Sequence, residues 1–81
     1  MKQILYFTAK WCSNCETMSP VIAQIKKQKR AQVAEVDTDY DVSLVEKYNV
    51  RSVPTVVILD NGVEINRHSG ALTYEQLNRF I

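Results

Sequence analysis

The first half of the chain alternates between strand-like and helical patterns, which restricts the fold to a layered α/β arrangement. The run Gln3–Thr8 has the length of one strand and is mostly apolar and aromatic, as in a strand covered on both faces. A helix is predicted from Ser13 to about Lys29, because apolar residues recur there at intervals of three and four. These residues are Met18, Val21, Ile22 and Ile25. A second strand is predicted over Gln32–Val36, parallel to the first because a right-handed helical crossover joins them.

The second half predicts a further helix and then a hairpin. Asp39 or Asp41 can cap the helix. Its buried face would consist of Leu44, Val45 and Tyr48. The β-branched run Thr55–Leu59 is followed by Asn61-Gly62, a strong hairpin signal, so Val63–His68 should return antiparallel.

The last helical segment begins near Thr73, which forms a capping-box pattern with Gln76. Its inward residues would be Tyr74, Leu77 and Ile81. The predicted fold class is therefore α/β, in the order βαβαββα, with a four-stranded mixed sheet and three helices. Eighty-one residues are enough for one domain and too few for two, so residues 1–81 are expected to form a single domain.

Charge and hydropathy predict neither a nucleic-acid partner nor a membrane partner. Ten Lys and Arg oppose nine Asp and Glu, for a net charge of +1. The basic run Lys26–Arg30 falls at the end of a predicted helix, where cations interact favourably with the helix dipole. No apolar stretch approaches the roughly 18 residues of a membrane span. No apolar run precedes a small-residue cleavage site, so no signal peptide is expected and a cytoplasmic location is predicted.

The candidate chemistry lies in Trp11-Cys12-Ser13-Asn14-Cys15, between the first predicted strand and helix. A helix N-terminus has unpaired N–H groups and about half a positive charge, and both stabilise a thiolate. They can lower a cysteine pKa from about 8.5 into the range of roughly 3.5–7.5. Cys12, at the boundary, is the better placed to attack, and Cys15 should be more buried. Ser13 also fits as a cap paired with Glu16, which would place Cys12 just outside the helix.

Two structural alternatives for the cysteine pair are less favoured. Inert core cysteines would not be expected at an exposed strand–helix boundary. A structural zinc site needs four ligands, whereas the chain offers two cysteines and the distant His68, so a metal would require a second chain. No metal is therefore predicted, and His68 is interpreted as a strand-end residue.

At these residues the chain resembles the thioredoxin family. The matching positions are Phe7, Ala9, Trp11, Cys12, Cys15, Pro20, Val36-Asp37, Arg51-Ser52-Val53-Pro54-Thr55, Asn61-Gly62 and Ser69-Gly70-Ala71-Leu72. The resemblance implies a thioredoxin-like fold of near-glutaredoxin size that lacks the usual N-terminal βα unit. It also implies that the proline matching Pro54 is cis and lies against the cysteines.

Three departures from the family bear on the site. Ser13-Asn14 stand where the family has Gly-Pro, Tyr6 stands where it has a buried aspartate, and Glu35 aligns with the partner lysine of that aspartate. A tyrosine, with an ordinary pKa of about 10, is a poor proton acceptor near neutral pH. Glu35 is therefore the candidate acid–base group, and a solvated strand residue is the alternative.

The resemblance implies a protein-disulfide reductase in which Cys12 is the nucleophile and Cys15 the resolving residue. The redox-active disulfide would be its only redox group, with no other cofactor. The implied substrate-binding rim consists of Trp11, Val53, Pro54, Gly70 and Ala71. The implied partners are disulfide-containing client proteins, among them ribonucleotide reductase, with a thioredoxin reductase or glutathione as electron donor. A monomer is expected.

Other functional classes stay open at this point. A glutaredoxin-type enzyme that uses glutathione fits the size, but Ser69-Gly70-Ala71-Leu72 offers no clear carboxylate-capturing pattern. A redox-inactive interaction module is disfavoured by two intact cysteines at a helix start. A metal-bridged dimer is the third alternative.

Overall fold

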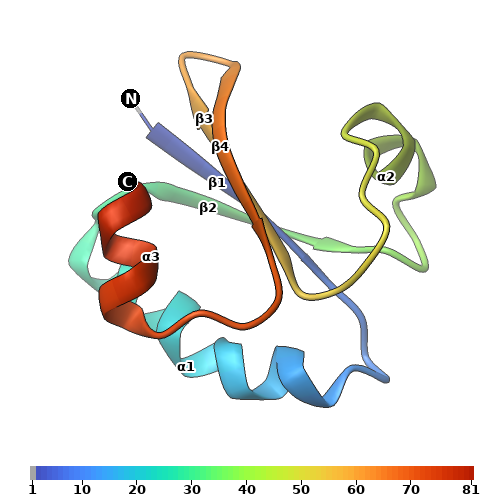
Figure 1. Cartoon of the computed structure of the whole chain (residues 1–81), viewed down its shortest axis with the longest axis horizontal. Helices are drawn as coiled ribbons and strands as arrows, with labels where there is room; N and C mark the ends of the chain where they lie inside the picture. The colour runs from blue at the N-terminus through green and yellow to red at the C-terminus, as the bar shows by residue number, and fades with distance from the viewer. Residues whose placement is uncertain (1) are drawn as a thin grey trace.

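The computed structural model describes residues 2–81, and its elements follow the predicted order (Figure 1). The strands are β1 (Lys2–Thr8), β2 (Gln32–Asp37), β3 (Thr55–Asp60) and β4 (Val63–Ser69). The helices are α1 (Ser13–Gln28), α2 (Val42–Lys47) and α3 (Tyr74–Phe80). The predicted limits of the strands and of the first helix are thus correct to within a single residue.

The four strands form one mixed sheet in the order β2-β1-β3-β4. β1 and β2 are parallel, and β3 is antiparallel to both β1 and β4, which confirms the predicted crossover and hairpin. Asn61 and Gly62 have φ of 51° and 87°, in the left-handed region that a tight hairpin turn requires. A register shift lies opposite β4, between Ile58 and Leu59.

The two faces of the sheet are covered unequally. Alternate residues of β1 point to opposite faces: Ile4 and Tyr6 join the core under α1 and α3, and Leu5 and Phe7 join the core under α2. The core under α1 and α3 consists of Ile4, Tyr6, Met18, Ile22, Ile25, Val56, Ile58, Leu72 and Leu77. The other face is thinner, because the predicted inward residues of the short helix α2 are only partly buried there.

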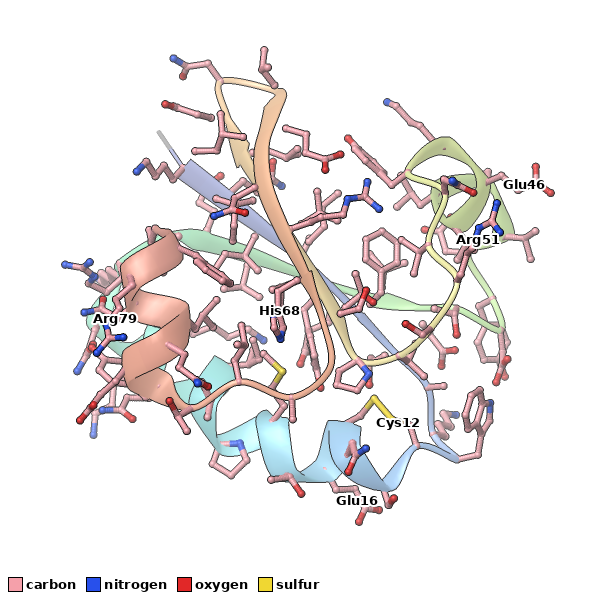
Figure 2. All side chains as sticks on the ribbon, in the orientation of Figure 1. Cys12, Glu16, Glu46, Arg51, His68 and Arg79 are labelled. Atoms are coloured by element: carbon pink, nitrogen blue, oxygen red, sulfur yellow. A yellow bond between two sulfur atoms is a disulfide. The ribbon has the colours of Figure 1, made fainter. Side chains whose placement is uncertain are left out.

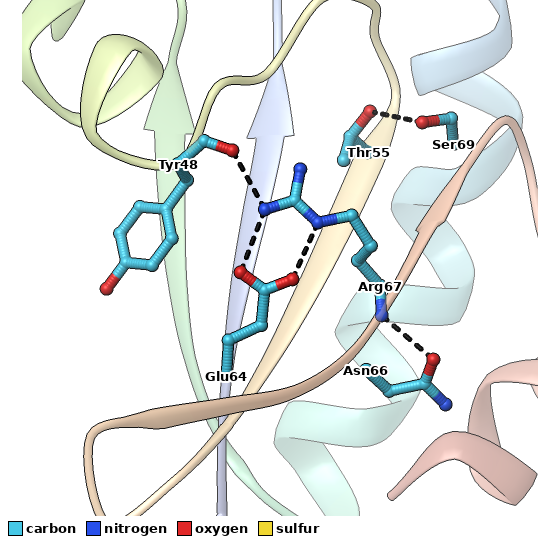
Figure 3. Close-up of polar contacts among 6 residues, drawn as sticks. All are labelled: Tyr48, Thr55, Glu64, Asn66, Arg67 and Ser69. Carbon is cyan, nitrogen blue, oxygen red and sulfur yellow. Dashed lines mark hydrogen bonds and ion pairs between the residues drawn. The ribbon is translucent and has the colours of Figure 1, made fainter.

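A polar cluster reinforces the thinner face (Figure 3). Arg67 on β4 donates to both carboxylate oxygens of Glu64, at 2.6 and 2.8 Å. The same guanidinium donates to the backbone carbonyl of Tyr48, just after α2, at 2.8 Å. The cluster therefore ties β4 to the segment that leads from α2 toward β3.

The helix caps agree with the sequence patterns in part. The capping box at α3 is confirmed, because the Gln76 N–H donates to Thr73 Oγ1 at 3.2 Å and the Thr73 N–H donates to Gln76 Oε1 at 3.0 Å. Asp41 is the N-cap residue of α2, and its carboxylate accepts a bond from the Ser43 hydroxyl rather than from the helix backbone. Across residues 2–81, no helix has the length and apolarity to cross a bilayer.

Candidate active site

The two cysteines lie at the N-terminal end of α1, where the strand β1 delivers the chain to the helix (Figure 2). Cys12 is the N-cap residue with extended backbone, and Cys15 lies in the first turn. They form a disulfide with their Cα atoms 5.3 Å apart. Ser13 is the first helical residue, so the alternative in which Ser13 caps the helix is wrong.

Cys12 is less exposed than predicted for a boundary residue. Its exposed fraction is 7%, against 4% for Cys15. The cause is packing, because the two cysteines form one buried cluster with Ala9, against which Val53 packs. Cys12 is thus the more exposed of the two cysteines, as predicted, but only by a small margin.

The sulfur of Cys12 serves as the acceptor that caps the helix. The Cys15 N–H donates to Cys12 Sγ at 3.1 Å, in the place where an oxygen of Ser or Asp ordinarily accepts. The Cys12 N–H in turn donates to the Ala9 carbonyl at 3.2 Å. Once the disulfide is reduced, a thiolate at Cys12 would meet both this N–H and the positive end of the helix dipole.

The loop before β3 contributes to the site, and the cis proline that the resemblance implied is confirmed. The Val53–Pro54 peptide is cis, Pro54 is fully buried, and Val53 packs on the cysteines. The Gly70 N–H donates to the Pro54 carbonyl at 2.8 Å, and Gly70 adopts a φ of 104°, which favours glycine. Gly70 is thus held beside the loop that carries Val53 and Pro54, and Ala71 follows it as an exposed residue.

Trp11 is 70% exposed, yet its indole is anchored. Its Nε1–H donates to Asp39 Oδ2 at 3.1 Å, and the Asp39 N–H donates to Asp37 Oδ1 at 2.9 Å. Lys10 Nζ lies 5.7 Å from the ring centre of Tyr40. Two neighbouring residues of the loop before α1 thus contact two neighbouring residues of the loop before α2. Asp39, a candidate helix cap by sequence, is therefore an anchor for Trp11. The sequence carried no specific signal for this pairing.

A groove of about 210 Å³ lies on the side of α2, next to Trp11 and to Val53, which packs in the cysteine cluster. Most of its side chains are apolar or small, with one cation, Arg51. Its lining consists of Trp11, Thr38, Val45, Val50, Arg51, Ser52 and Val53.

A second hollow, of about 190 Å³, borders the pair on the side of β2. It is lined by hydroxyl groups and charges as well as by the two cysteines. The lining residues are Tyr6, Thr8, Ala9, Lys10, Cys12, Cys15, Glu16, Ser19 and Glu35.

Tyr6 lies beneath the cysteine pair with an exposed fraction of 2%. Its hydroxyl donates to the Cys15 carbonyl at 3.1 Å. Burial raises the pKa of Tyr6 above its ordinary value, and the Glu35 carboxylate raises it further, whereas a hydrogen bond with Thr8 opposes them. The phenol is therefore a neutral donor near neutral pH, as expected of a poor proton acceptor.

Glu35 is the neighbour of Tyr6 on the adjoining strand β2 and lines the same hollow as Cys15. Its side chain is 50% exposed, and one of its oxygens lies 3.1 Å from Lys26 Nζ. The carboxylate thus lies at the rim of the hollow in an ion pair, between the buried site and solvent.

His68 lies on β4 with its ring 5.8 Å from that of Phe80, in keeping with a half-buried strand residue. Within the part of the chain that the structure describes, no three side chains of His, Cys, Asp or Glu gather in a way that could hold a metal. A metal-bridged dimer would therefore have to draw ligands from a second chain.

Comparison with known proteins gives a consistent result. A family model described as Thioredoxin matches residues 1–81. Thioredoxin C-3 of Corynebacterium nephridii is 39% identical over 74 residues, which cover 90% of this chain and 51% of that protein. The chloroplastic Thioredoxin Y of Oryza sativa subsp. japonica is 33% identical over 73 residues, covering 88% of this chain and 44% of the relative. The chain thus spans about half the length of these curated relatives.

Solved structures agree with the sequence matches. A mutant thioredoxin from Halobacterium salinarum NRC-1 superimposes with a TM-score of 0.94 at 31% identity, covering 99% of this chain and 71% of the other. The thioredoxin of Fasciola hepatica gives 0.88 at 33% identity, covering 99% and 77%. The chain thus shares its fold with these thioredoxins over nearly its whole length.

Proposed function

The chain belongs to the thioredoxin family, and from this premise we propose that it reduces protein disulfides through Cys12 and Cys15. The observation that carries the proposal is the Cys15 N–H, 3.1 Å from Cys12 Sγ at the start of a helix. A charge-assisted hydrogen bond and the helix dipole both favour a thiolate over a thiol. This arrangement supports Cys12 as the nucleophile and Cys15 as the resolving cysteine.

The proposed reaction proceeds in two exchanges. The Cys12 thiolate attacks one sulfur of the client disulfide, so that a mixed disulfide forms and the other client sulfur leaves as a thiolate. Cys15 then loses its proton and attacks Cys12 Sγ, which releases the second client thiolate and closes the Cys12–Cys15 disulfide. Both client thiolates take protons from solvent. The client gains two electrons, and the cysteine pair loses them.

The rim around the pair supports an extended client segment. The apolar groove beside Trp11 and Val53 would take a side chain next to the client cysteine. Pro54, Gly70 and Ala71 would border the segment on the other side, where Gly70 presents no side chain to an approaching backbone.

Glu35 is proposed as the group that receives the proton of Cys15. Its place in the hollow that reaches Cys15 supports the role. Its exposure and its pairing with Lys26 suggest a modest contribution, made through water rather than by direct contact.

The oxidised pair must be reduced again, and a donor dithiol or thiol is required for each turnover. We propose a thioredoxin reductase as the donor in a cytoplasmic setting, with glutathione as the alternative. Ribonucleotide reductase is a proposed client on family grounds. Turnover with each donor in parallel assays separates the two donors.

The test compares two serine variants. Cys12→Ser should abolish reduction of a protein disulfide, whereas Cys15→Ser should accumulate a mixed disulfide with the client, detectable by mass spectrometry and released by dithiothreitol. Ser13→Ala, in the same turn, is the control and should retain turnover. A mixed disulfide on Cys15 in Cys12→Ser, with none on Cys12 in Cys15→Ser, would contradict the assignment.

A further inference from the structure

The residue Cys15 is held at both ends of its backbone. Its N–H donates to Cys12 Sγ at 3.1 Å, and its carbonyl accepts from the Tyr6 hydroxyl at 3.1 Å. The first bond places the Cys15 N–H against the attacking sulfur of Cys12. The second bond, from Tyr6, holds Cys15 in the position from which it makes the first. We propose that Tyr6 is a positioning residue that sets the acidity of Cys12 by keeping the Cys15 N–H directed at its sulfur.

The surroundings of Tyr6 suit it to this role. Tyr6 lies in the middle of β1, which is paired on both sides by β2 and β3, and its ring is packed in the core beneath α1 and α3. Side chains on such a scaffold hold their positions better than side chains on loops. Because burial keeps the phenol protonated, it remains a donor to the carbonyl.

Pro20 removes one hydrogen bond from the first turns of α1. Pro20 lies within the helix and has no N–H, so the Glu16 carbonyl, four residues earlier, cannot receive its helical hydrogen bond. The turn that carries Cys15 is thereby less firmly held by the helix itself. The Tyr6 hydroxyl bonds to the carbonyl of Cys15, the residue before Glu16. This bond from the sheet compensates for the helical hydrogen bond that Pro20 removes.

The titratable groups that surround the site lie on several elements. Lys10, Glu16 and Glu35 line the hollow, Asp39 anchors Trp11, Arg51 lines the groove, and His68 lies on β4. A substitution that removes only the phenol oxygen leaves all of these in place. The change from Tyr6 to phenylalanine therefore isolates the contribution of the phenol hydroxyl, through its hydrogen bonds to Cys15 and Thr8.

The test uses two matched tyrosine variants of the full chain in its reduced form. Tyr6→Phe removes the buried bond to the Cys15 carbonyl, and Tyr74→Phe removes an exposed tyrosine bond to the Gln28 side chain at the far end of α1. The pKa of Cys12 is read from the ultraviolet absorbance of the thiolate and from its alkylation rate. In Tyr6→Phe the pKa of Cys12 should rise. At a pH below that pKa, the alkylation rate of Cys12 should fall about two- to tenfold, the range for one lost neutral hydrogen bond. Tyr74→Phe should match the wild type.

An unchanged Cys12 pKa in a folded Tyr6→Phe variant would overturn the proposal. Should that variant fail to fold, NMR of the wild type decides instead. A slowly exchanging Tyr6 hydroxyl proton, together with a Cys15 amide resonance that shifts as Cys12 titrates, supports the proposal, and the absence of either overturns it. The inference rests on the proposed function only in taking Cys12 as nucleophile. A wild type that cannot reduce protein disulfides would refute that function without affecting these measurements.

Discussion

Two hollows of similar size and different chemistry lie near the cysteine pair, one next to Trp11 and Val53 and the other lined by the cysteines themselves. The groove toward α2 measures about 210 Å³ and is lined largely by Trp11 and three valines, whereas the hollow toward β2 measures about 190 Å³ and is lined by hydroxyls, carboxylates and a lysine. The groove suits the side chains of a client. The hollow suits the movement of a proton, because it reaches Cys15 and contains polar groups.

The two hollows also differ in the elements that form them. The groove lies between α2 and three connecting segments, around Trp11, Thr38 and Val50–Val53. The hollow lies mostly between β1, β2 and the first turns of α1. Loops tolerate substitution, whereas strands and helices fix geometry. The fold is therefore expected to tolerate substitutions in the groove better than substitutions in the hollow.

The largest effect that separates the two sides is expected from Trp11→Ala. The substitution removes an anchored indole from the groove and should lower kcat/KM for a protein client about thirtyfold, the effect of a single aromatic hot spot of ~2 kcal/mol. Reduction of a small disulfide reagent should change little, since such a reagent does not fill the groove. An equal loss with both substrates would mean that Trp11 acts on Cys12 itself.

A smaller effect is expected from Glu35→Gln, on the other side. The rate at which Cys15 resolves the mixed disulfide should fall by about three- to tenfold, well below the 10²–10⁴ of a base in direct contact, because the carboxylate is half exposed and paired with Lys26. The loss should be the same for protein and small substrates, as measured by rapid acid quench. Glu64→Gln removes a carboxylate from β4 and serves as the control. A loss confined to protein clients would assign Glu35 to client binding.

The smallest effect concerns the polar cluster that supports the groove side. The hydrogen bond from Arg67 lowers the pKa of Glu64 below its ordinary value of 4.5, so Glu64 adds stability above that value and loses it as the pH falls through the lowered pKa. The pair is partly exposed, so its contribution is ~0.2–1 kcal/mol. Urea denaturation at neutral and acidic pH should show Glu64→Gln less stable than wild type only at neutral pH. A deficit that persists in acid would point to lost packing instead.

Much of the fold follows from local pattern. The helix from Ser13, the hairpin at Asn61-Gly62 and the capping box at Thr73 depend on residues close in sequence, so the sequence alone predicts them. The position of the cysteine pair follows for the same reason, because a strand and a helix flank it directly.

The contacts of the site were less predictable. The anchoring of Trp11 by Asp39 joins residues 28 positions apart, and the bond between Tyr6 and Cys15 depends on how α1 lies across the sheet. The partial burial of Cys12 likewise results from Val53, which a separate loop brings in. Such contacts are set by the tertiary arrangement, for which a single sequence carries no periodic signal.

The register shift between Ile58 and Leu59 has a consequence for the behaviour of the protein in concentrated solution. It distorts the pairing with β4, which is the last strand of the sheet on that side and carries Glu64 and Arg67 among its exposed residues. An irregular, charged border strand is a poor template for strand addition by another molecule, even though β4 itself exposes Val63 and Ile65. Strand addition along this border of the sheet is thereby disfavoured.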